Sequence, residues 1–224
     1  MLQLLLILIA GYLIGSLPTA VIISKRFFGF DIRKHGSGNS GATNAFRVLG
    51  WKAGLAVQVI DVANGILAVV VVSWIYNGVL PFHNRTPFED ITIVRFIGGS
   101  AAVLGHIYSV FAQFKGGKGI NAALGVVVSI APVDAAVAVG IFLIVVLSSG
   151  YISLGAIVAA CALPTTMFVR YNVFQVPIEH YNTLIIFSSL IATVLVYAHR
   201  SNIRRLWRGT ESRFSNLRLF KSSH

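Results

Sequence analysis

Charged side chains are scarce in this chain of 224 residues, and acidic ones are the scarcest. Only 11% of the residues are charged, against about a quarter in soluble domains, while 56% are hydrophobic. The 7 Asp and Glu residues face 18 Lys and Arg residues, which leaves a formal net charge of +11. Together with a mean hydropathy of +0.79, this balance excludes an ordinary soluble domain and predicts an integral membrane protein.

Three further absences argue against other classes of protein. The single cysteine, Cys161, lies in an apolar run, so we expect a buried structural thiol and no disulfide framework. The basic residues lie at the ends of apolar segments and do not line a soluble face, which argues against a nucleic-acid partner. No cluster of His, Cys and carboxylates suggests a metal, so we expect no metal and no cofactor.

The long apolar segments predict membrane helices, since about 20 residues cross the hydrocarbon core. The stretch from Ile120 to Leu147 is too long for one span and short for two, and Pro132 and Asp134 divide it. The first segment has no positive charge before it, which predicts an uncleaved helix with the N-terminus outside. The expected spans cover roughly 2–24, 53–75, 93–112, 118–132, 134–149, 151–170 and 183–199.

The basic residues predict the topology. All but three of the 18 lie in segments 25–52 and 113–120 and in the tail from residue 200. The positive-inside rule places all three segments in the cytoplasm. An odd number of spans is then required, so residues 118–149 must cross twice. The predicted fold is an all-α integral membrane protein with seven transmembrane helices, N-terminus outside and C-terminus cytoplasmic, in one polytopic domain over residues 1–224.

Three polar motifs fall on the predicted cytoplasmic side. They are KHGSGNSGATNAFR at 34–47, GHIYSVFAQFKGGKG at 105–119 and HRSNIRRLWRGTE at 199–211. Glycines let backbone N–H groups approach a ligand, and a helix N-terminus after GGKG suits an anion. Lys and Arg supply positive charge, while Ser, Thr and Asn form hydrogen bonds without repelling oxyanions. The motifs therefore predict one shared site for phosphate groups.

Each motif alone has a simpler interpretation. GSGNSG at 36–41 matches the dinucleotide-binding pattern, but a membrane helix precedes it where a strand is required. KGGKG lacks the leading Gly and the Ser or Thr of a Walker A loop, and alone it would be a basic turn at the membrane edge. The Arg-rich tail alone would be a topology anchor. Asp61 and Asp134 either bond within their helices or, as intramembrane acids, indicate function.

Together, the three motifs resemble those of the bacterial acyl-phosphate-dependent glycerol-3-phosphate acyltransferases, the PlsY family. The first matches GSGNxGATN with a following Arg, the second resembles GHxxPxFxxFKGGKG, and the third resembles HRxNIxRLxxGxE. The resemblance runs from the first helix to near Glu211. Ser109 stands where the family usually has Pro, and Asn64 occupies a position that is often Lys, which leaves the partner of Asp61 open.

The resemblance implies transfer of a fatty acyl group from acyl phosphate to the 1-hydroxyl of sn-glycerol 3-phosphate. The products would be lysophosphatidate and phosphate, in the first acylation of phospholipid synthesis. It further implies a monomer in the bacterial cytoplasmic (inner) membrane, among membrane lipid, with its active site on the cytoplasmic face. Whether this protein meets the peripheral enzyme that forms acyl phosphate stays open.

Motif position also implies two sets of site residues. Arg47 and Lys118 would neutralise phosphate charge, and Asn44, Ser37 or loop amides would stabilise the oxyanion of the transition state. The general base stays open between His199 and the phosphate of the donor. The catalytic set is Ser37, Asn44, Arg47, Lys118, His199 and Asn202. The phosphate-binding set is Gly38, Gly41, Thr43, Gly116, Gly117 and Arg205, the glycines acting through their amides.

Other functions explain less of the sequence. No His is followed five residues later by an acid, and no G-x-S-x-G elbow is present, which excludes the acyl-CoA-dependent acyltransferases and the serine hydrolases. The alternative is a membrane transporter for an organic phosphate, which needs polar groups along a path to the outer face. Here the candidate groups gather at one face. A lipid-binding scaffold explains the basic tail but not the three motifs.

Overall fold

The computed structural model describes residues 1–84 and 89–213, so Arg85, Arg218 and Lys221 of the charge analysis lie outside it. The secondary structure of these residues is entirely helical, and no strand occurs among them. By internal packing the chain divides into two compact units, residues 1–130 and 131–224. The single domain over residues 1–224 stays a prediction.

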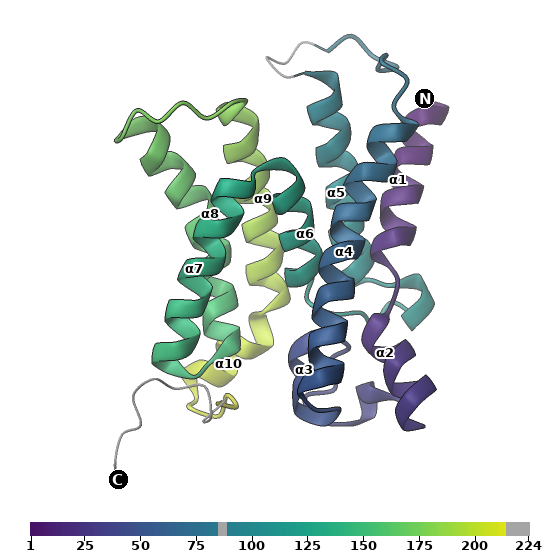
Figure 1. Cartoon of the computed structure of the whole chain (residues 1–224), viewed down its shortest axis with the longest axis vertical. Coiled ribbons are helices and arrows are strands. Elements are labelled where there is room, and N and C mark those ends of the chain that lie inside the picture. The colour runs from purple at the N-terminus through teal and green to yellow at the C-terminus, as the bar shows by residue number, and fades with distance from the viewer. Residues whose placement is uncertain (85–88, 214–224) are drawn as a thin grey trace. The chain divides into compact units, whose positions relative to one another are not determined.

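In the first unit, the long helix α4 contacts α1, α3, α5 and α6 (Figure 1). Short helical turns connect the long helices and carry the first two polar motifs. The elements are α1 (Leu2–Gly15), α2 (Thr19–Ile23), a π-helix (Ser24–Phe28), a 3₁₀ turn (Ile32–Lys34), α3 (Ala42–Val48), α4 (Trp51–Ile75), α5 (Asp90–Ile107), a 3₁₀ turn (Val110–Ala112) and α6 (Ile120–Ile130).

Glycines bring the backbones of these helices into close contact. Gly11 of α1 faces the backbone of Gly98 in α5, and Gly65 of α4 faces Gly125 in α6. A Cβ added at Gly11, Gly65 or Gly125 would clash with a carbonyl of the facing helix. In a membrane, where lipid tails are as apolar as Leu, close backbone packing is a main source of helix association.

The predicted span over residues 2–24 is a bent pair of helices. Helix α1 ends at Gly15, α2 begins at Thr19, and the two axes differ by 42°. Pro18 explains the break, because it has no N–H to donate and it disfavours helical backbone at Leu17. The chain leaves the direction of α1 just before the segment that carries Lys25 and Arg26.

Five helices in the described residues are long and apolar enough to cross a membrane, and the bent pair makes six. Helix α6 has 11 residues, a length of about 17 Å, which is short of the ~30 Å hydrocarbon core. The expected division at Pro132 is present, since α7 begins at that residue. The protein is therefore a helical integral membrane protein, while seven crossings and the orientation of the termini stay predictions.

The second unit consists of α7 (Pro132–Ser149), α8 (Ile152–Asn172), α9 (Tyr181–Ala198) and α10 (Arg200–Trp207). Helix α8 packs against both α7 and α9, and the short α10 contacts α8 and α9 (Figure 1). Asp134, buried in the first turn of α7, pairs with Arg170 in the last turn of α8. Because the two helices are antiparallel neighbours, this ion pair joins their ends.

Cys161 is exposed on the surface of α8. The prediction of a buried structural thiol is therefore wrong. In an apolar membrane helix, hydropathy does not separate the face that meets lipid from the face that meets protein, because both are apolar.

Candidate active site

The first motif folds into a tight loop around the side chain of Asn44. Its Oδ1 accepts a hydrogen bond from the backbone N–H of Ser37 at 2.9 Å. Its Nδ2 donates to the carbonyls of His35 at 3.0 Å, Asn39 at 2.9 Å and Ile32 at 3.3 Å. Asn44 is 1% exposed, so these contacts support a structural role at the centre of the loop and not the catalytic role that the motif suggested.

The glycines of this loop are also used internally. Gly36 and Gly38 adopt left-handed backbone, with φ of 60° and 73°. The N–H of Gly38 donates to the His35 carbonyl at 3.1 Å, and the N–H of Gly41 donates to Asn39 Oδ1 at 2.9 Å. These two amides therefore shape the loop, which argues against their predicted role as phosphate ligands.

The remaining predicted residues of the first motif lie where a ligand can reach them. Ser37 is exposed on the loop, and Thr43 and Arg47 are partly exposed on α3. Helix α3 begins at Ala42 directly after the loop, so the loop and these side chains are held by one short helix.

The second motif doubles back onto the end of α5. The N–H of Gly116 donates to the Ile107 carbonyl at 3.1 Å, and that of Gly117 donates to the His106 carbonyl at 2.9 Å. The ring of His106 packs against Gly117 and leaves no room for a Cβ. Both amides therefore form hydrogen bonds within the chain, and both glycines pack closely against the end of α5, while their predicted role in binding phosphate stays a prediction. Lys118, partly exposed, follows them at the entrance to α6.

Asp61 of α4 lies close to this second loop. It is 1% exposed, and neither carboxylate oxygen has a hydrogen bond of normal geometry among the described residues. The side chains of Thr19 and Asn121 approach it, and the His106 ring is within electrostatic range. Thr19, Asn121 and His106 are thus polar neighbours of Asp61. One helical turn further along α4, the Nδ2 of Asn64 is buried and has no hydrogen-bond partner among the described residues.

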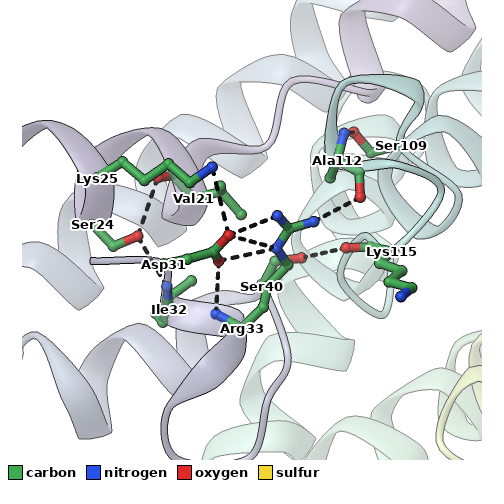
Figure 2. Close-up of polar contacts among 10 residues, drawn as sticks. All are labelled: Val21, Ser24, Lys25, Asp31, Ile32, Arg33, Ser40, Ser109, Ala112 and Lys115. Atoms are coloured by element: carbon green, nitrogen blue, oxygen red, sulfur yellow. Dashed lines mark hydrogen bonds and ion pairs between the residues drawn. The ribbon is translucent and has the colours of Figure 1, made fainter. Parts of the chain in front are cut away.

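Two contacts hold the first loop against the second (Figure 2). Arg33, which precedes the first motif, donates through Nη1 to the carbonyl of Ala112 at 2.8 Å. Ser40 in the first motif donates to the carbonyl of Lys115 at 3.5 Å, a long hydrogen bond. The structure thus brings together the two glycine-rich loops that the sequence placed on the same side.

The third motif, in the second unit, is organised around Glu211. Its Oε1 accepts from Asn202 Nδ2 at 2.8 Å and from Ser153 Oγ at 3.0 Å, and its Oε2 accepts from Arg205 Nε at 2.6 Å. Burial acts to raise the pKa of Glu211, but the hydrogen bonds from Arg205, Asn202 and Ser153 outweigh it, and the pKa is lowered. The carboxylate therefore stays ionised and holds α10 against α8.

His199 lies at the junction of α9 and α10, where it is buried. Its Nδ1 lies 2.8 Å from the carbonyl of Leu195. Because a carbonyl only accepts, Nδ1 carries a proton and donates it to this carbonyl. The hydrogen bond fixes the orientation of the ring.

The predicted site residues lie in both units. Those of 34–47 and 105–119 belong to the first unit and those of 199–211 to the second, so the convergence of all three motifs stays a prediction. Four residues that organise these segments were not predicted from the sequence. Two of them were detectable as isolated acidic residues. Asp31 is the only acid before residue 61, and Glu211 is the only acid after residue 179. The four are Asp31, Arg33, Ser153 and Glu211.

These features define a helical membrane protein whose polar loops, at the ends of its helices, suit phosphate groups. Residues 5–209 match the family described as glycerol-3-phosphate acyltransferase. The glycerol-3-phosphate acyltransferase of Chlorobaculum tepidum is 45% identical over 231 residues, which cover 96% of this chain and 98% of that protein. That of Chlorobium phaeovibrioides is 44% identical over 232 residues, which cover 95% and 97%.

Two crystal structures are also similar. Both are of PlsY (YgiH), an integral membrane glycerol 3-phosphate acyltransferase, in a glycerol 3-phosphate form and a lysophosphatidic acid form. They match with TM-scores of 0.78 and 0.77, at 34% and 33% sequence identity, over 96% of this chain and of each of theirs. The chain belongs to the glycerol-3-phosphate acyltransferase family, and its structure matches PlsY.

Proposed function

We propose that this protein transfers a fatty acyl group from acyl phosphate to the 1-hydroxyl of sn-glycerol 3-phosphate at the cytoplasmic face of a bacterial inner membrane. The observation that carries the proposal is the pair of glycine-rich loops joined at one end of the first unit, with Arg47 and Lys118 beside them. Both substrates carry phosphate. The related structures in glycerol 3-phosphate and lysophosphatidic acid forms support this acceptor and this product.

The reaction needs little proton chemistry from the protein. The acceptor hydroxyl attacks the acyl carbonyl carbon, the bond from that carbon to the phosphate oxygen breaks, and the departing phosphate takes the hydroxyl proton. The products are lysophosphatidate and inorganic phosphate. Because phosphate is a good leaving group, the main requirement is stabilisation of negative charge on the carbonyl oxygen and on the phosphates.

Side chains, and not glycine amides, are assigned to the phosphates. All four predicted glycine amides donate within the chain, at Gly38, Gly41, Gly116 and Gly117. We therefore assign phosphate binding to Arg47, Lys118, Ser37 and Thr43, with the positive N-terminal end of α6 beginning two residues after Lys118. The Asn44 side chain shapes the loop that presents Ser37.

The third motif is proposed to complete the site. The positive-inside rule assigns its basic residues to the same face as the first two motifs. The contact from Nδ1 to the Leu195 carbonyl fixes the orientation of the His199 ring, and we assign this ring to orienting the acceptor hydroxyl. Glu211 accepts hydrogen bonds from Asn202 and Arg205, so we assign these two residues to holding the third motif in place beside His199, and not to binding the glycerol phosphate.

The test is a reconstitution with purified protein. We expect phosphate release and lysophosphatidate formation only when acyl phosphate and glycerol 3-phosphate are both present. Acyl-CoA in place of acyl phosphate should give no lysophosphatidate. Product from acyl-CoA, or phosphate release without the acceptor, contradicts the proposal.

A further inference from the structure

Asp31 and Arg33 form an ion pair with two-point geometry beside the first motif (Figure 2). Arg33 Nε donates to the two carboxylate oxygens at 3.0 and 3.2 Å, and Nη2 donates to Oδ2 at 2.7 Å. The backbone N–H of Arg33 also donates to Oδ1 at 3.0 Å. Lys25 Nζ lies 3.5 Å from Oδ2. The guanidinium plane is therefore fixed on one edge by a single carboxylate.

The opposite edge of the guanidinium reaches the second motif. Nη1 donates at 2.8 Å to the carbonyl of Ala112, which is buried in the 3₁₀ turn just before KGGKG. That turn is itself fixed, since the Ala112 N–H donates to Ser109 Oγ at 3.2 Å, and Ser109 Oγ donates to the carbonyl of Ser16. Arg33 thus connects the start of the first loop to a rigid point of the second.

The pair adds no net charge to the phosphate site. The hydrogen bond from Arg33 lowers the pKa of Asp31 far below its usual range, against the opposing effect of burial. The same bond raises the pKa of Arg33. Both groups remain ionised and neutralise each other, so Arg33 differs in role from Arg47 and Lys118.

We propose that Asp31 and Arg33 form a positioning clamp that sets the spacing between the loops at 34–47 and 105–119. Arg33 acts through the carbonyl of Ala112 and not by binding phosphate. The clamp adds to the proposed function. Its kinetic test depends on that function, whereas its structural test does not.

The kinetic test uses the opposite charge changes of two substitutions. Asp31→Asn adds one positive charge beside the site, and Arg33→Met removes one. If charge alone mattered, the two would change the KM for glycerol 3-phosphate in opposite directions. A clamp predicts the same direction: each lowers kcat/KM roughly 10- to 100-fold, as expected for a small misplacement of binding groups. The double variant should be no worse than the worse single variant, because the residues act as a unit.

Two further variants serve as controls. Arg26→Met removes the same charge from an exposed position on the π-helix, and its kcat/KM should change by about two-fold or less. Arg33→Lys keeps the charge but lacks the planar fork, so it should not restore activity. Recovery of activity by Arg33→Lys, or improved binding in Asp31→Asn, would overturn the clamp.

The structural test does not depend on activity. Cysteines at positions 40 and 115, in a full-length Cys161→Ala background, are treated in membranes with a short bifunctional maleimide. Cross-linking reports the effective concentration of one thiol at the other, and we expect its rate to fall by about five-fold or more with Asp31→Asn or Arg33→Met, but not with Arg26→Met. Unchanged cross-linking in both clamp variants refutes the proposal. A wild-type protein without transferase activity refutes the proposed function alone.

Discussion

The loop around Asn44 and the segment around Glu211 are built on the same plan with different chemistry. Each has one buried polar side chain that receives or donates several hydrogen bonds. Asn44 is neutral and bonds mainly to backbone groups, whereas Glu211 is charged and bonds to three side chains. The first arrangement fixes a chain path, and the second fixes the positions of a Ser, an Asn and an Arg.

The difference between Asn44 and Glu211 has consequences for the charge of the two motifs. The neutral side chain of Asn44 adds no negative charge to the first loop, where Arg47 and Lys118 are proposed to bind phosphate. A charged centre neutralises Arg205, which is therefore suited to hold structure. It also makes the third motif sensitive to acid, while the first loop has no ionisable centre.

The largest effect is expected when the neutral Asn44 is replaced by a charged carboxylate like that of Glu211. Asn44→Asp should abolish activity, because a carboxylate cannot donate to the three carbonyls around it, and an unpaired buried charge costs roughly 3–5 kcal/mol. The matched control is Asn39→Asp, since the Asn39 side chain only accepts, from Gly41. Activity and thermal midpoint of the purified variants check this. An active Asn44→Asp enzyme would show that Asn44 is not the centre of the loop.

The next largest effect is expected from removing the positive charges that are proposed to bind phosphate. Lys118→Ala and Arg47→Ala should each lower kcat by about 100-fold or more, as expected when a charged transition-state contact is removed, while the protein still inserts and purifies normally. Arg205→Ala should instead lower the thermal midpoint. If Arg205→Ala proves the most damaging to kcat at unchanged stability, the assignment of charge is reversed.

A pair of glycines tests the packing around the neutral centre. Gly36 and Gly29 both adopt left-handed backbone, so Ala costs each about 1–2 kcal/mol. Only at Gly36 would the added Cβ clash with Asn44, whereas nothing lies near Gly29. We expect Gly36→Ala to lower kcat/KM by about ten-fold and Gly29→Ala to leave it nearly unchanged. Equal losses in the two variants would mean that backbone strain alone matters.

The smallest effect is expected at Glu211, whose contribution to stability should depend on pH. Glu211→Gln should lower the free energy of unfolding by about 1.5–3 kcal/mol, the usual worth of hydrogen bonds to a charged group. The native pKa of Glu211 is lowered from its ordinary 4.5. Its stabilisation is therefore fully present above that ordinary pKa and is lost as the pH falls through the lower native pKa.

Thermal melts of the two proteins between neutral pH and pH 3 check this sign. The wild type should lose its advantage over Glu211→Gln only on the acid side of the ordinary pKa. A constant difference at every pH would show that the charge of Glu211 is not what holds the third motif.

The helices were largely predictable and their irregularities less so. Apolar length located α4, α8 and α9 within a few residues, since hydrophobic span length is a property of the sequence alone. The bend at Pro18 has a local cause that the apolar run concealed. Helix α6 is short because Gly119, with left-handed backbone, lies directly before it and Pro132 begins the next helix.

The candidate site was predictable as a set of motifs but not as a set of roles. The motifs implied that Asn44 stabilises the oxyanion and that four glycine amides bind phosphate, whereas in the structure these polar groups form hydrogen bonds within the chain. Composition shows which groups are able to bind phosphate, but only the folded loop shows which are already occupied. Asp31 and Glu211 were detectable as isolated acids among cations, whereas Ser153 gave no signal.

The contact from Ser109 to the carbonyl of Ser16 has a consequence for how the chain tolerates change. A helix end leaves carbonyls without partners, and α1 ends just before Pro18, beside the second loop. The hydroxyl that satisfies this carbonyl also caps the turn of Ala112. A substitution that moves the end of the first helix therefore alters a loop ninety residues away, and in evolution the two positions are expected to vary together and not independently.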